Sequence, residues 1–452
     1  MRAEGVAEVA IDTFDAQLER LRGGEKGVLA ESEIEPVSSL PDADDLPADE
    51  EGARAALAQT VVIKLNGGLG TSMGMTGPKS LLEVKDGLTF LDITVRQILD
   101  LRTHMDAALP LVLMNSFATR DASLRALEPY GDLPVQGVAA DFLQSRVPKL
   151  DAGTLEPASW PDEPSLEWAP PGHGDLYPSL LSSGMLDALL GGGYRYAFVA
   201  NVDNLGAVME PRILAWLARE RIPFLMEVAD RTAADRKGGH LAQRSDGGLV
   251  LREIAQTPAE DVAAFQDTSR HRFFNTNTLW IDLRALRHVL DERGGVLGLP
   301  MIVNRKTVDP ADPSSAPVIQ LETAMGAAID VFEGARAIRV PRGRFAPVKT
   351  TDDLLALRSD AYVLGDDGAI AVAPERDGAG APLVQLDPEH FRLVHDFEAR
   401  FPAGPPSLVA AQRLTVRGDV AFGAGVVVRG SVTVEHDGGG QRRIADGALL
   451  DG

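Results

Sequence analysis

The sequence of 452 residues contains no cysteine. This absence excludes disulfides, thiolate nucleophiles and cysteine-ligated zinc or iron–sulfur sites. Long apolar runs are missing as well, because none approaches the roughly 20 residues that a membrane-spanning helix needs. Near the N-terminus, acidic residues stand where a signal peptide would carry its apolar segment. We therefore expect a cytoplasmic protein with no membrane partner.

Positive charge is scarce too. The sequence has 44 Lys and Arg against 66 Asp and Glu, which gives a net charge of −22 at pH 7. Binding to a nucleic-acid backbone depends on Lys and Arg neutralising its phosphates, so we expect no nucleic-acid partner. Any phosphate ligand would have to meet a locally positive pocket in an acidic molecule.

The length predicts more than one domain, at about 100–200 residues for each. The apolar fraction of 44% is enough to fill several cores. We divide the chain into an N-terminal helix and acidic linker over 1–57, an α/β domain over 58–356, a connecting segment over 357–410 and a C-terminal domain over 411–452.

The N-terminal region combines a helical pattern with a helix-breaking one. Residues 8–30 are amphipathic at helical spacing, which predicts a helix that ends near "RGGEKG". Residues 31–51 contain no Lys or Arg and are interrupted by three prolines, so we expect a solvated, extended linker that wraps the surface.

From about residue 58, short apolar runs alternate with helical segments. The runs "TVVIKL", "LPLVLMN", "YRYAFVAN" and "PFLMEVAD" predict strands that are covered on both faces. The segments "TFLDITVRQILDLRT" and "RDASLRALEPY" predict helices. This alternation indicates an α/β domain with a mainly parallel sheet, which binds ligands beyond the carboxyl ends of its strands.

The C-terminal domain shows a repeat of six residues. Leu414, Val420, Val426 and Val432 recur at that spacing, with glycines four residues after the first and the third. This rhythm predicts a left-handed β-helix, and a plain hairpin is the alternative. An open coil end would present unpaired strand edges, through which a homo-oligomer could form.

A glycine-rich stretch, "KLNGGLGTSMGMTGPKS" at 64–80, follows the first predicted strand. It fails the P-loop pattern, because Pro78 separates Gly77 from Lys79, and it fails the dinucleotide pattern, because Met73 replaces the third glycine. Backbone N–H groups and a lysine on a proline-fixed turn still suit a phosphate. The alternative is a surface turn with an exposed lysine.

Two further stretches carry polar groups that suit phosphate chemistry. In "PPGHGDLYPSL", His173 stands between two glycines and offers a neutral or cationic donor, although a lone histidine is more often structural. In "FVANVDNLGA", Asn201, Asp203 and Asn204 follow a strand and are expected to be exposed. Asp203 is then a candidate Mg²⁺ ligand, unless it caps the following helix.

Together these stretches resemble the eukaryotic-type UTP–glucose-1-phosphate uridylyltransferases, or UDP-glucose pyrophosphorylases. "ADRKGGHL" at 234–241, "FFNTNTLWI" at 273–281 and "RFAPVKTTDDLL" at 344–355 agree with this resemblance. The resemblance implies a Rossmann-like nucleotidyltransferase fold of the GT-A type, with catalysis in 58–356. One departure is Met75-Thr76, which replaces a small-then-basic pair and removes a phosphate contact.

The resemblance also implies a role for each matching residue. Lys79 and Lys349 would be catalytic, the first on the UTP phosphates and the second on the charge developing at the α-phosphoryl group. Asp203 would hold Mg²⁺, the expected cofactor. The remaining assignments are Leu65, Asn66, Gly67 and Gly68 along the nucleotide, Gln144 and Gly172 at uracil, His173 at the sugar phosphate, and Asn201 and Asn277 at the sugar or its phosphate. Lys64 receives no role.

The implied reaction is Mg²⁺-dependent transfer of UMP from UTP to glucose 1-phosphate, with UTP and glucose 1-phosphate as the partners. An alternative is a related uridylyltransferase that takes N-acetylglucosamine 1-phosphate or several sugar 1-phosphates, although the asparagine of "LNGG" favours glucose. A second is a catalytically silent UDP-sugar-binding scaffold, against which stand the retained Lys79, Asp203 and Lys349. A phosphotransferase or NTPase is disfavoured because no complete P-loop or kinase signature is present.

Overall fold

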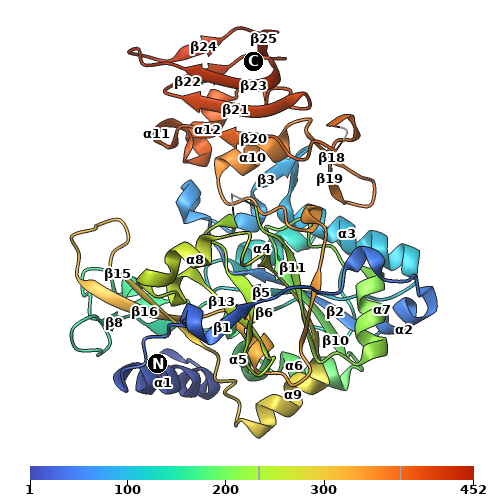
Figure 1. The fold of residues 1–452 in the computed structure, drawn as a ribbon, viewed down its shortest axis with the longest axis vertical. Helices are drawn as coiled ribbons and strands as arrows, with labels where there is room; N and C mark the ends of the chain where they lie inside the picture. The colour runs from blue at the N-terminus through green and yellow to red at the C-terminus, as the bar shows by residue number, and fades with distance from the viewer. Residues whose placement is uncertain (233–234, 377) are drawn as a thin grey trace.

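A mixed ten-stranded sheet lies at the centre of the molecule (Figure 1). The computed structural model describes residues 1–232, 235–376 and 378–452. The strands of the sheet are β1 (Ile34–Pro36), β2 (Thr60–Asn66), β5 (Leu111–Asn115), β6 (Asp141–Leu143), β10 (Tyr196–Asn201), β11 (Phe224–Asp230), β12 (His240–Arg244), β13 (Leu249–Arg252), β14 (Phe273–Asp282) and β17 (Arg336–Arg339). Its main path runs β1-β12-β14-β10-β2-β5-β6, while β11 joins β14 to β17 and β13 pairs with β12.

Strand direction confirms a mixed, mainly parallel sheet. In the described part of the chain, β2, β5, β6, β10, β11, β12 and β17 run one way, and β1, β13 and β14 run the other. The four apolar runs are confirmed as β2, β5, β10 and β11. Because β2 lies between β10 and β5 in parallel register, its carboxyl end opens at the middle of the sheet.

Helices cover both faces of the sheet. Along β2, Val61 and Ile63 belong to one buried core and Val62 belongs to the other, as alternation along a strand requires. The first core is completed by α5 (Leu176–Ser182), α6 (Met185–Gly191) and α9 (Leu283–Glu292), and the second by α2 (Glu50–Leu57), α3 (Phe90–Met105) and α7 (Pro211–Glu220). In Figure 1 the first group lies at the bottom and the second at the right.

Smaller elements surround this central body. The predicted helices near 89–103 and 120–130 are confirmed as α3 and α4 (Arg120–Leu127). None of the helices in the described ranges is both long and apolar enough to cross a bilayer. The other elements are α8 (Val262–Gln266), the three-stranded sheet of β8 (Leu150–Asp151), β15 (Met301–Thr307) and β16 (Pro317–Thr323), and the pairs β3 (Glu83–Lys85) with β4 (Leu88–Thr89), β7 (Val147–Pro148) with β9 (Trp168–Ala169), and β18 (Tyr362–Leu364) with β19 (Ile370–Val372).

The N-terminal region is tied down along its length. The predicted helix is α1 (Glu8–Arg22), which ends at the start of "GGEK". The acidic segment after it wraps the surface as expected, but it is not simply solvated. Its strand β1 pairs with β12, and the Glu31 carboxylate accepts hydrogen bonds from Arg252 and Arg270 at 2.5 and 2.6 Å. The linker therefore belongs to the fold of the α/β body, while the predicted domain boundaries stay predictions.

The C-terminal strands stack in parallel above the sheet (Figure 1). Leu414 pairs with Val432, so the plain hairpin is wrong, because a hairpin pairs its strands antiparallel. The strands are β20 (Leu383–Gln385), β21 (Ala411–Arg417), β22 (Val420–Phe422), β23 (Val427–Glu435), β24 (Arg442–Ile444) and β25 (Leu449–Asp451). The helix α10 (Thr351–Arg358) precedes β20, and α11 (Pro388–Phe391) and α12 (Val394–Arg400) lie between β20 and β21. The left-handed turn of a β-helix and oligomer formation at its end stay predictions.

Glycines at the corners of these coils fit the parallel stacking. Gly418 has φ +81°, and a Cβ there would overlap the backbone oxygen of His436 in the next coil. Gly447 has φ +69°, but a Cβ there would meet no atom within 4 Å. The two glycines thus share the left-handed conformation and differ in the space around it.

We expect Gly418→Ala to destabilise the C-terminal domain more than Gly447→Ala does. The control carries only the strain of a left-handed residue, about 1–2 kcal/mol, whereas Gly418→Ala must also push two coils apart. Urea unfolding of the two full-length variants would measure the difference. Equal losses of unfolding free energy would contradict the stacked arrangement at this corner.

Candidate active site

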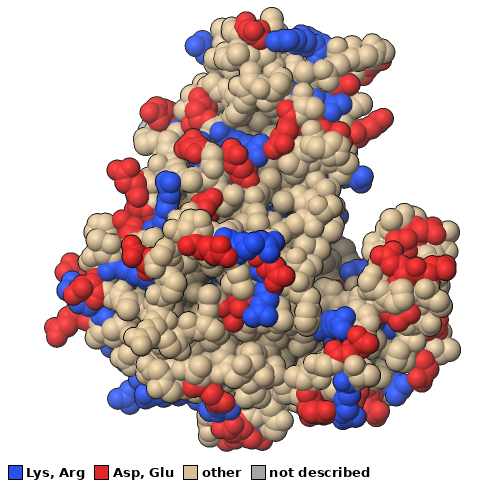
Figure 2. Space-filling view, turned by 180° about the vertical axis from the view of Figure 1, so that it is seen from behind, with Lys and Arg blue, Asp and Glu red and all other residues tan. Residues whose placement is uncertain are grey.

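A cavity of about 330 Å³ opens beside the carboxyl ends of the neighbouring parallel strands β2 and β10. This is the position at which open α/β sheets bind ligands. On the face shown in Figure 2, Lys and Arg are mixed with Asp and Glu. Nine of the predicted site residues line the cavity: Leu65, Gly67, Gly68, Lys79, Gln144, Gly172, His173, Asn201 and Asp203.

The glycine-rich loop closes on its neighbours. A Cβ on Gly67 would come within 2.5 Å of the Gln144 side-chain oxygen, so the glycine lets Gln144 lie directly against the loop. Gly68 has no atom within 4 Å of such a Cβ, and its carbonyl accepts a hydrogen bond from the Lys79 N–H at 3.0 Å. The loop therefore presents open backbone at Gly68 and fixes the start of Lys79.

Asn66 faces away from the cavity. Its Nδ2 donates to the Asn115 Oδ1 at 2.7 Å and to the Ser123 hydroxyl at 2.8 Å, and the residue is 1% exposed. The side chain therefore ties the end of β2 to β5 and α4. Any contact with a nucleotide would have to come from its backbone.

Lys79 and Asp203 form an ion pair inside the cavity. The Lys79 Nζ lies 2.5 Å from the Asp203 Oδ2, and both side chains are largely shielded from solvent. The alternative reading of Asp203 as a helix cap is wrong, because the cap of α7 is Glu210, which accepts from the Arg212 N–H. Without a ligand, each of the two charged groups thus serves as the counter-ion of the other.

The donor set around Asp203 suits a magnesium ion held together with substrate. Among the residues that the structure describes, no cluster of three or more His, Asp or Glu side chains could enclose a metal alone. Mg²⁺ is bound through one or two carboxylates plus substrate phosphates rather than by an all-protein cage. The single Asp203 carboxylate fits that mode.

His173 is a neutral donor. Burial lowers its pKa to about 4, so the ring is uncharged at neutral pH. Its Nδ1 accepts a hydrogen bond from the Met325 N–H at 2.9 Å, which places the single ring proton on Nε2. The cationic form expected as one option is therefore disfavoured. The flanking glycines are needed because Cβ atoms there would overlap Thr323.

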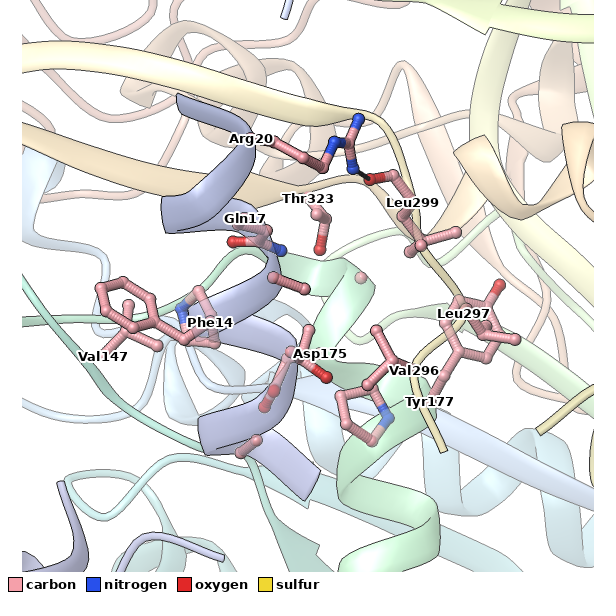
Figure 3. Close-up of a pocket in the computed structure, with 17 residues that line it drawn as sticks. Phe14, Gln17, Arg20, Val147, Asp175, Tyr177, Val296, Leu297, Leu299 and Thr323 are labelled. Atoms are coloured by element: carbon pink, nitrogen blue, oxygen red, sulfur yellow. Dashed lines mark hydrogen bonds between the residues drawn. The ribbon is translucent and has the colours of Figure 1, made fainter. Parts of the chain in front are cut away.

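Asp175 links the Gln144 segment to the His173 turn, and no motif in the sequence pointed to this role. Its Oδ2 accepts from the Ser145 N–H at 2.6 Å and from the Ser179 hydroxyl at 2.7 Å. Ser145 follows Gln144, so the carboxylate fixes Gln144 relative to the His173 turn. Asp175 also lines a second cavity, next to α1 (Figure 3). Phe14 of α1 lines the same cavity. Burial raises the pKa of Asp175 to about 7.

Of the residues predicted at the sugar or its phosphate, His173 and Asn201 line this cavity, and Asn277 does not. Asn277 lies in a bulge of β14, between the residues that pair with Glu227 and Val228 of β11. It has φ +57°, and its Oδ1 accepts a hydrogen bond from the Asn275 Nδ2 at 2.8 Å. Of "ADRKGGHL", Ala234 lies outside the described residues, and a Cβ on Gly239 would meet the carboxylate of Glu253. Burial raises the pKa of Glu253, and the positive charge of Lys349 opposes that rise.

Lys349 lies outside the cavity that holds Lys79. Its side chain is exposed, with the Nζ 5.7 Å from the centre of the Phe345 ring. The preceding residue, Val348, donates its N–H to the Asp203 carbonyl at 3.4 Å. Lys349 and Glu253 thus stand at the edge of the site. Glu253 had no motif signal beyond its position shortly after "KGGH".

The raised pKa of Asp175 predicts a pH-dependent stability. Between about pH 4 and pH 7 the folded chain holds a proton that the unfolded chain has lost, so this group makes stability fall as pH rises. Asp175→Asn carries no titrating carboxyl group at this position, so its stability does not fall with pH for this reason. We expect the unfolding free energy of the variant, relative to that of the wild type, to increase by about 2–3 kcal/mol between pH 5 and pH 8 in urea unfolding.

Asp387→Asn is the matched control. The Asp387 carboxylate also accepts backbone N–H bonds, from Glu389 and Gly418, but its pKa is lowered and it stays ionised across this range. Its effect on stability should not change between pH 5 and pH 8. A pH-independent effect of Asp175→Asn would contradict the raised pKa.

Comparison with known proteins identifies the family. Residues 11–429 match the model of the UTP–glucose-1-phosphate uridylyltransferase family. The potato protein of that name is 43% identical over 406 residues, which cover 90% of this chain and 83% of the relative. A fission yeast protein described as a probable enzyme of the same kind is 40% identical, covering 88% of this chain and 77% of the relative.

Solved structures agree. UDP-glucose pyrophosphorylase from Leishmania major is 48% identical with a TM-score of 0.93, covering 100% of this chain and 96% of that one. A variant of it, with the same identity and TM-score, was solved in complex with UDP-glucose. A Trypanosoma brucei structure described as UDP-glucose phosphorylase is 47% identical with a TM-score of 0.92, at the same coverage. The chain belongs to the UTP–glucose-1-phosphate uridylyltransferase family of nucleotidyltransferases.

Proposed function

We propose that this chain transfers UMP from UTP to glucose 1-phosphate, forming UDP-glucose and pyrophosphate, with Mg²⁺ as cofactor. The observation that carries the proposal is the Lys79–Asp203 ion pair, in one cavity with Gln144 and His173. That cavity combines a phosphate lysine, a magnesium ligand, a base-binding carboxamide and a neutral donor for the sugar phosphate. Each corresponds to one part of the two substrates.

The reaction places an anion against a polyanion. A phosphate oxygen of glucose 1-phosphate attacks the α-phosphorus of UTP, the bond from that phosphorus to the bridging oxygen of the β-phosphate breaks, and pyrophosphate leaves with the electron pair. The attacking phosphate is already ionised at neutral pH, so no general base is required. Catalysis then depends on positioning and on positive charge.

Lys79 is already in place to supply that charge. In the free protein its ammonium group is neutralised by Asp203 at 2.5 Å. UTP would offer phosphate oxygens to Lys79 and leave the Asp203 carboxylate to hold Mg²⁺. When bound, Mg²⁺ supplies positive charge to the phosphate oxygens. The ion pair would thus keep both groups ready while the site is empty.

His173 suits the sugar phosphate because its donor does not depend on protonation. With the ring proton on Nε2, it can donate to a phosphate or hydroxyl oxygen throughout the neutral pH range. The carboxamides of Asn201 and Asn277 can both donate and accept, as sugar hydroxyls require. Glu253 adds an acceptor on that side, and Lys349 would approach the α-phosphoryl group from the edge of the site.

The C-terminal coils are proposed to turn left-handed. We also propose that the chain forms an oligomer through the last coil. The strand β25 pairs with β23 along one edge, and the other edge of β25 would provide the contact for a second copy of the chain. Size measurement in solution, with and without the C-terminal residues of β25, would separate a monomer from such an oligomer.

Pyrophosphate release tests the proposed reaction directly. We expect rapid release with UTP and glucose 1-phosphate, and much slower release when N-acetylglucosamine 1-phosphate or another sugar 1-phosphate replaces it. Chelation of divalent cations should stop the reaction, and added Mg²⁺ should restore it. No release with glucose 1-phosphate would overturn the proposal, and faster release with N-acetylglucosamine 1-phosphate would favour the alternative substrate.

Substitution of Lys79 or Lys349 tests the role proposed for each lysine at the substrate phosphates. We expect Lys79→Ala and Lys349→Ala each to lower kcat/KM by ~10²-fold or more, by analogy with the loss of one preorganised donor. Lys26→Ala, which removes an exposed lysine beyond the end of α1, is the control and should leave the rate unchanged. Near-wild-type turnover in either site variant would rule out the role given to that lysine.

A further inference from the structure

Lys64 is a buried charge in the middle of a central strand. It is 2% exposed on β2, which has β10 on one side and β5 on the other. By strand alternation its side chain shares a face with Val62, away from the cavity that holds Lys79. Burial lowers its pKa to about 7. An ammonium group at such a position is costly unless its hydrogen bonds serve the structure around it.

The Lys64 amine holds the turn that follows β10. Its Nζ donates to the Ala207 carbonyl at 2.9 Å and lies 5.7 Å from the centre of the Phe198 ring. Asp203 and Ala207 lie in two successive turns that share Asn204, because the Asn204 N–H bonds the Asn201 carbonyl and the Ala207 N–H bonds the Asn204 carbonyl, each at 3.2 Å. Lys64 thus holds the end of this double turn, which carries Asp203.

The same turn is bound to the segment that carries Lys349. The Asn204 Nδ2 donates to the Arg344 carbonyl at 3.2 Å, and its Oδ1 accepts from the Ala346 N–H at 2.9 Å. Asn204 was expected to be exposed, but it is 2% exposed and joins these two segments. The Val348 N–H adds a bond to the Asp203 carbonyl at 3.4 Å.

A second, partly buried basic side chain holds the neighbouring carbonyl. The Arg344 Nη2 donates to the Val208 carbonyl at 2.8 Å, next to the carbonyl that Lys64 holds. Two further bonds, at 2.7 and 2.8 Å, join the Arg344 guanidinium to the Glu227 carboxylate, which also accepts from the Trp280 Nε1. The consecutive carbonyls of Ala207 and Val208, at the end of the double turn, are therefore each held by a basic side chain.

We propose that Lys64 is a positioning residue for the transfer reaction: by holding the Ala207 carbonyl, it fixes the turn that carries Asp203 relative to the segment that carries Lys349. The inference rests on the proposed function, since both groups act on the same phosphates there. Lys64 itself touches no substrate. Loss of its hydrogen bond would leave the Ala207 carbonyl buried without that donor and allow the turn to shift.

Lys64→Met is the test, because methionine keeps a similar length and removes the donor. We expect kcat per folded molecule to fall by about 10–100-fold, as a small displacement of a charged group would cause. The KM for UTP should change less than kcat, because the uracil contacts proposed for Gln144 and Gly172 lie on other segments. Amide hydrogen exchange measured by mass spectrometry should become faster in peptides over 201–209 and 343–350.

Lys149→Met is the matched control. Lys149 is also buried, and its Nζ donates to a backbone carbonyl, that of Val308 at 2.7 Å. Its loss should speed exchange near 147–151 and 305–310 and leave kcat per folded molecule unchanged. A wild-type kcat in Lys64→Met would overturn the positioning role. So would amide exchange that becomes faster evenly along the whole chain, as a general loss of stability predicts, and not mainly over 201–209 and 343–350.

Asn204→Ala provides a second variant if Lys64→Met does not fold. It removes the two bonds to Arg344 and Ala346, so exchange over 343–350 should rise and kcat should fall. Faster exchange there with full kcat would contradict the proposal. Absence of pyrophosphate release by the wild-type protein would instead contradict the proposed function, so the two failures are distinguishable.

Discussion

The ion pair between Lys79 and Asp203 is the interaction on which the rest of the site depends. It joins the glycine-rich loop after β2 to the turn after β10, and these parallel strands bring the two groups to one edge of the sheet. The pair is shielded from solvent, which strengthens the attraction, yet both partners keep access to the cavity. In the proposed reaction, phosphate oxygens would replace the carboxylate at the lysine. The ion pair would thus hold the free protein close to the arrangement that substrate needs.

Buried polar groups outside the cavity keep that arrangement rigid. Asp175 fixes the position of Gln144 relative to His173, while Lys64 and Arg344 hold adjacent carbonyls at the end of the double turn that carries Asp203. Each of these groups is expensive to bury and would be replaced by an apolar residue if packing alone mattered. Their hydrogen bonds reach backbone atoms next to the predicted substrate contacts. Such support is what preorganised electrostatic catalysis requires.

Much of the fold could be predicted from local patterns. The apolar runs predicted four central strands, and the six-residue repeat predicted the C-terminal coils. Both patterns lie within short segments of the chain, so they can be recognised without knowing which distant segments pair. The reversed direction of β14, its bulge at Asn277 and the docked acidic linker could not be predicted, because they depend on pairings between distant segments. Motifs located most of the cavity lining. They did not reveal Lys64, whose partner Ala207 is 143 residues away, nor the buried state of Asn204.

We propose that Lys79 exchanges Asp203 for substrate phosphate. Crystal structures of the chain without ligand and with UTP and Mg²⁺ would test it most directly. We expect the Lys79 Nζ to lie against the Asp203 carboxylate in the free protein, as it does at 2.5 Å here. With UTP and Mg²⁺ bound, it should lie within hydrogen-bond distance of a phosphate oxygen, with Asp203 turned to the metal. A complex in which Lys79 stays on Asp203 while the phosphates bind elsewhere would contradict the account.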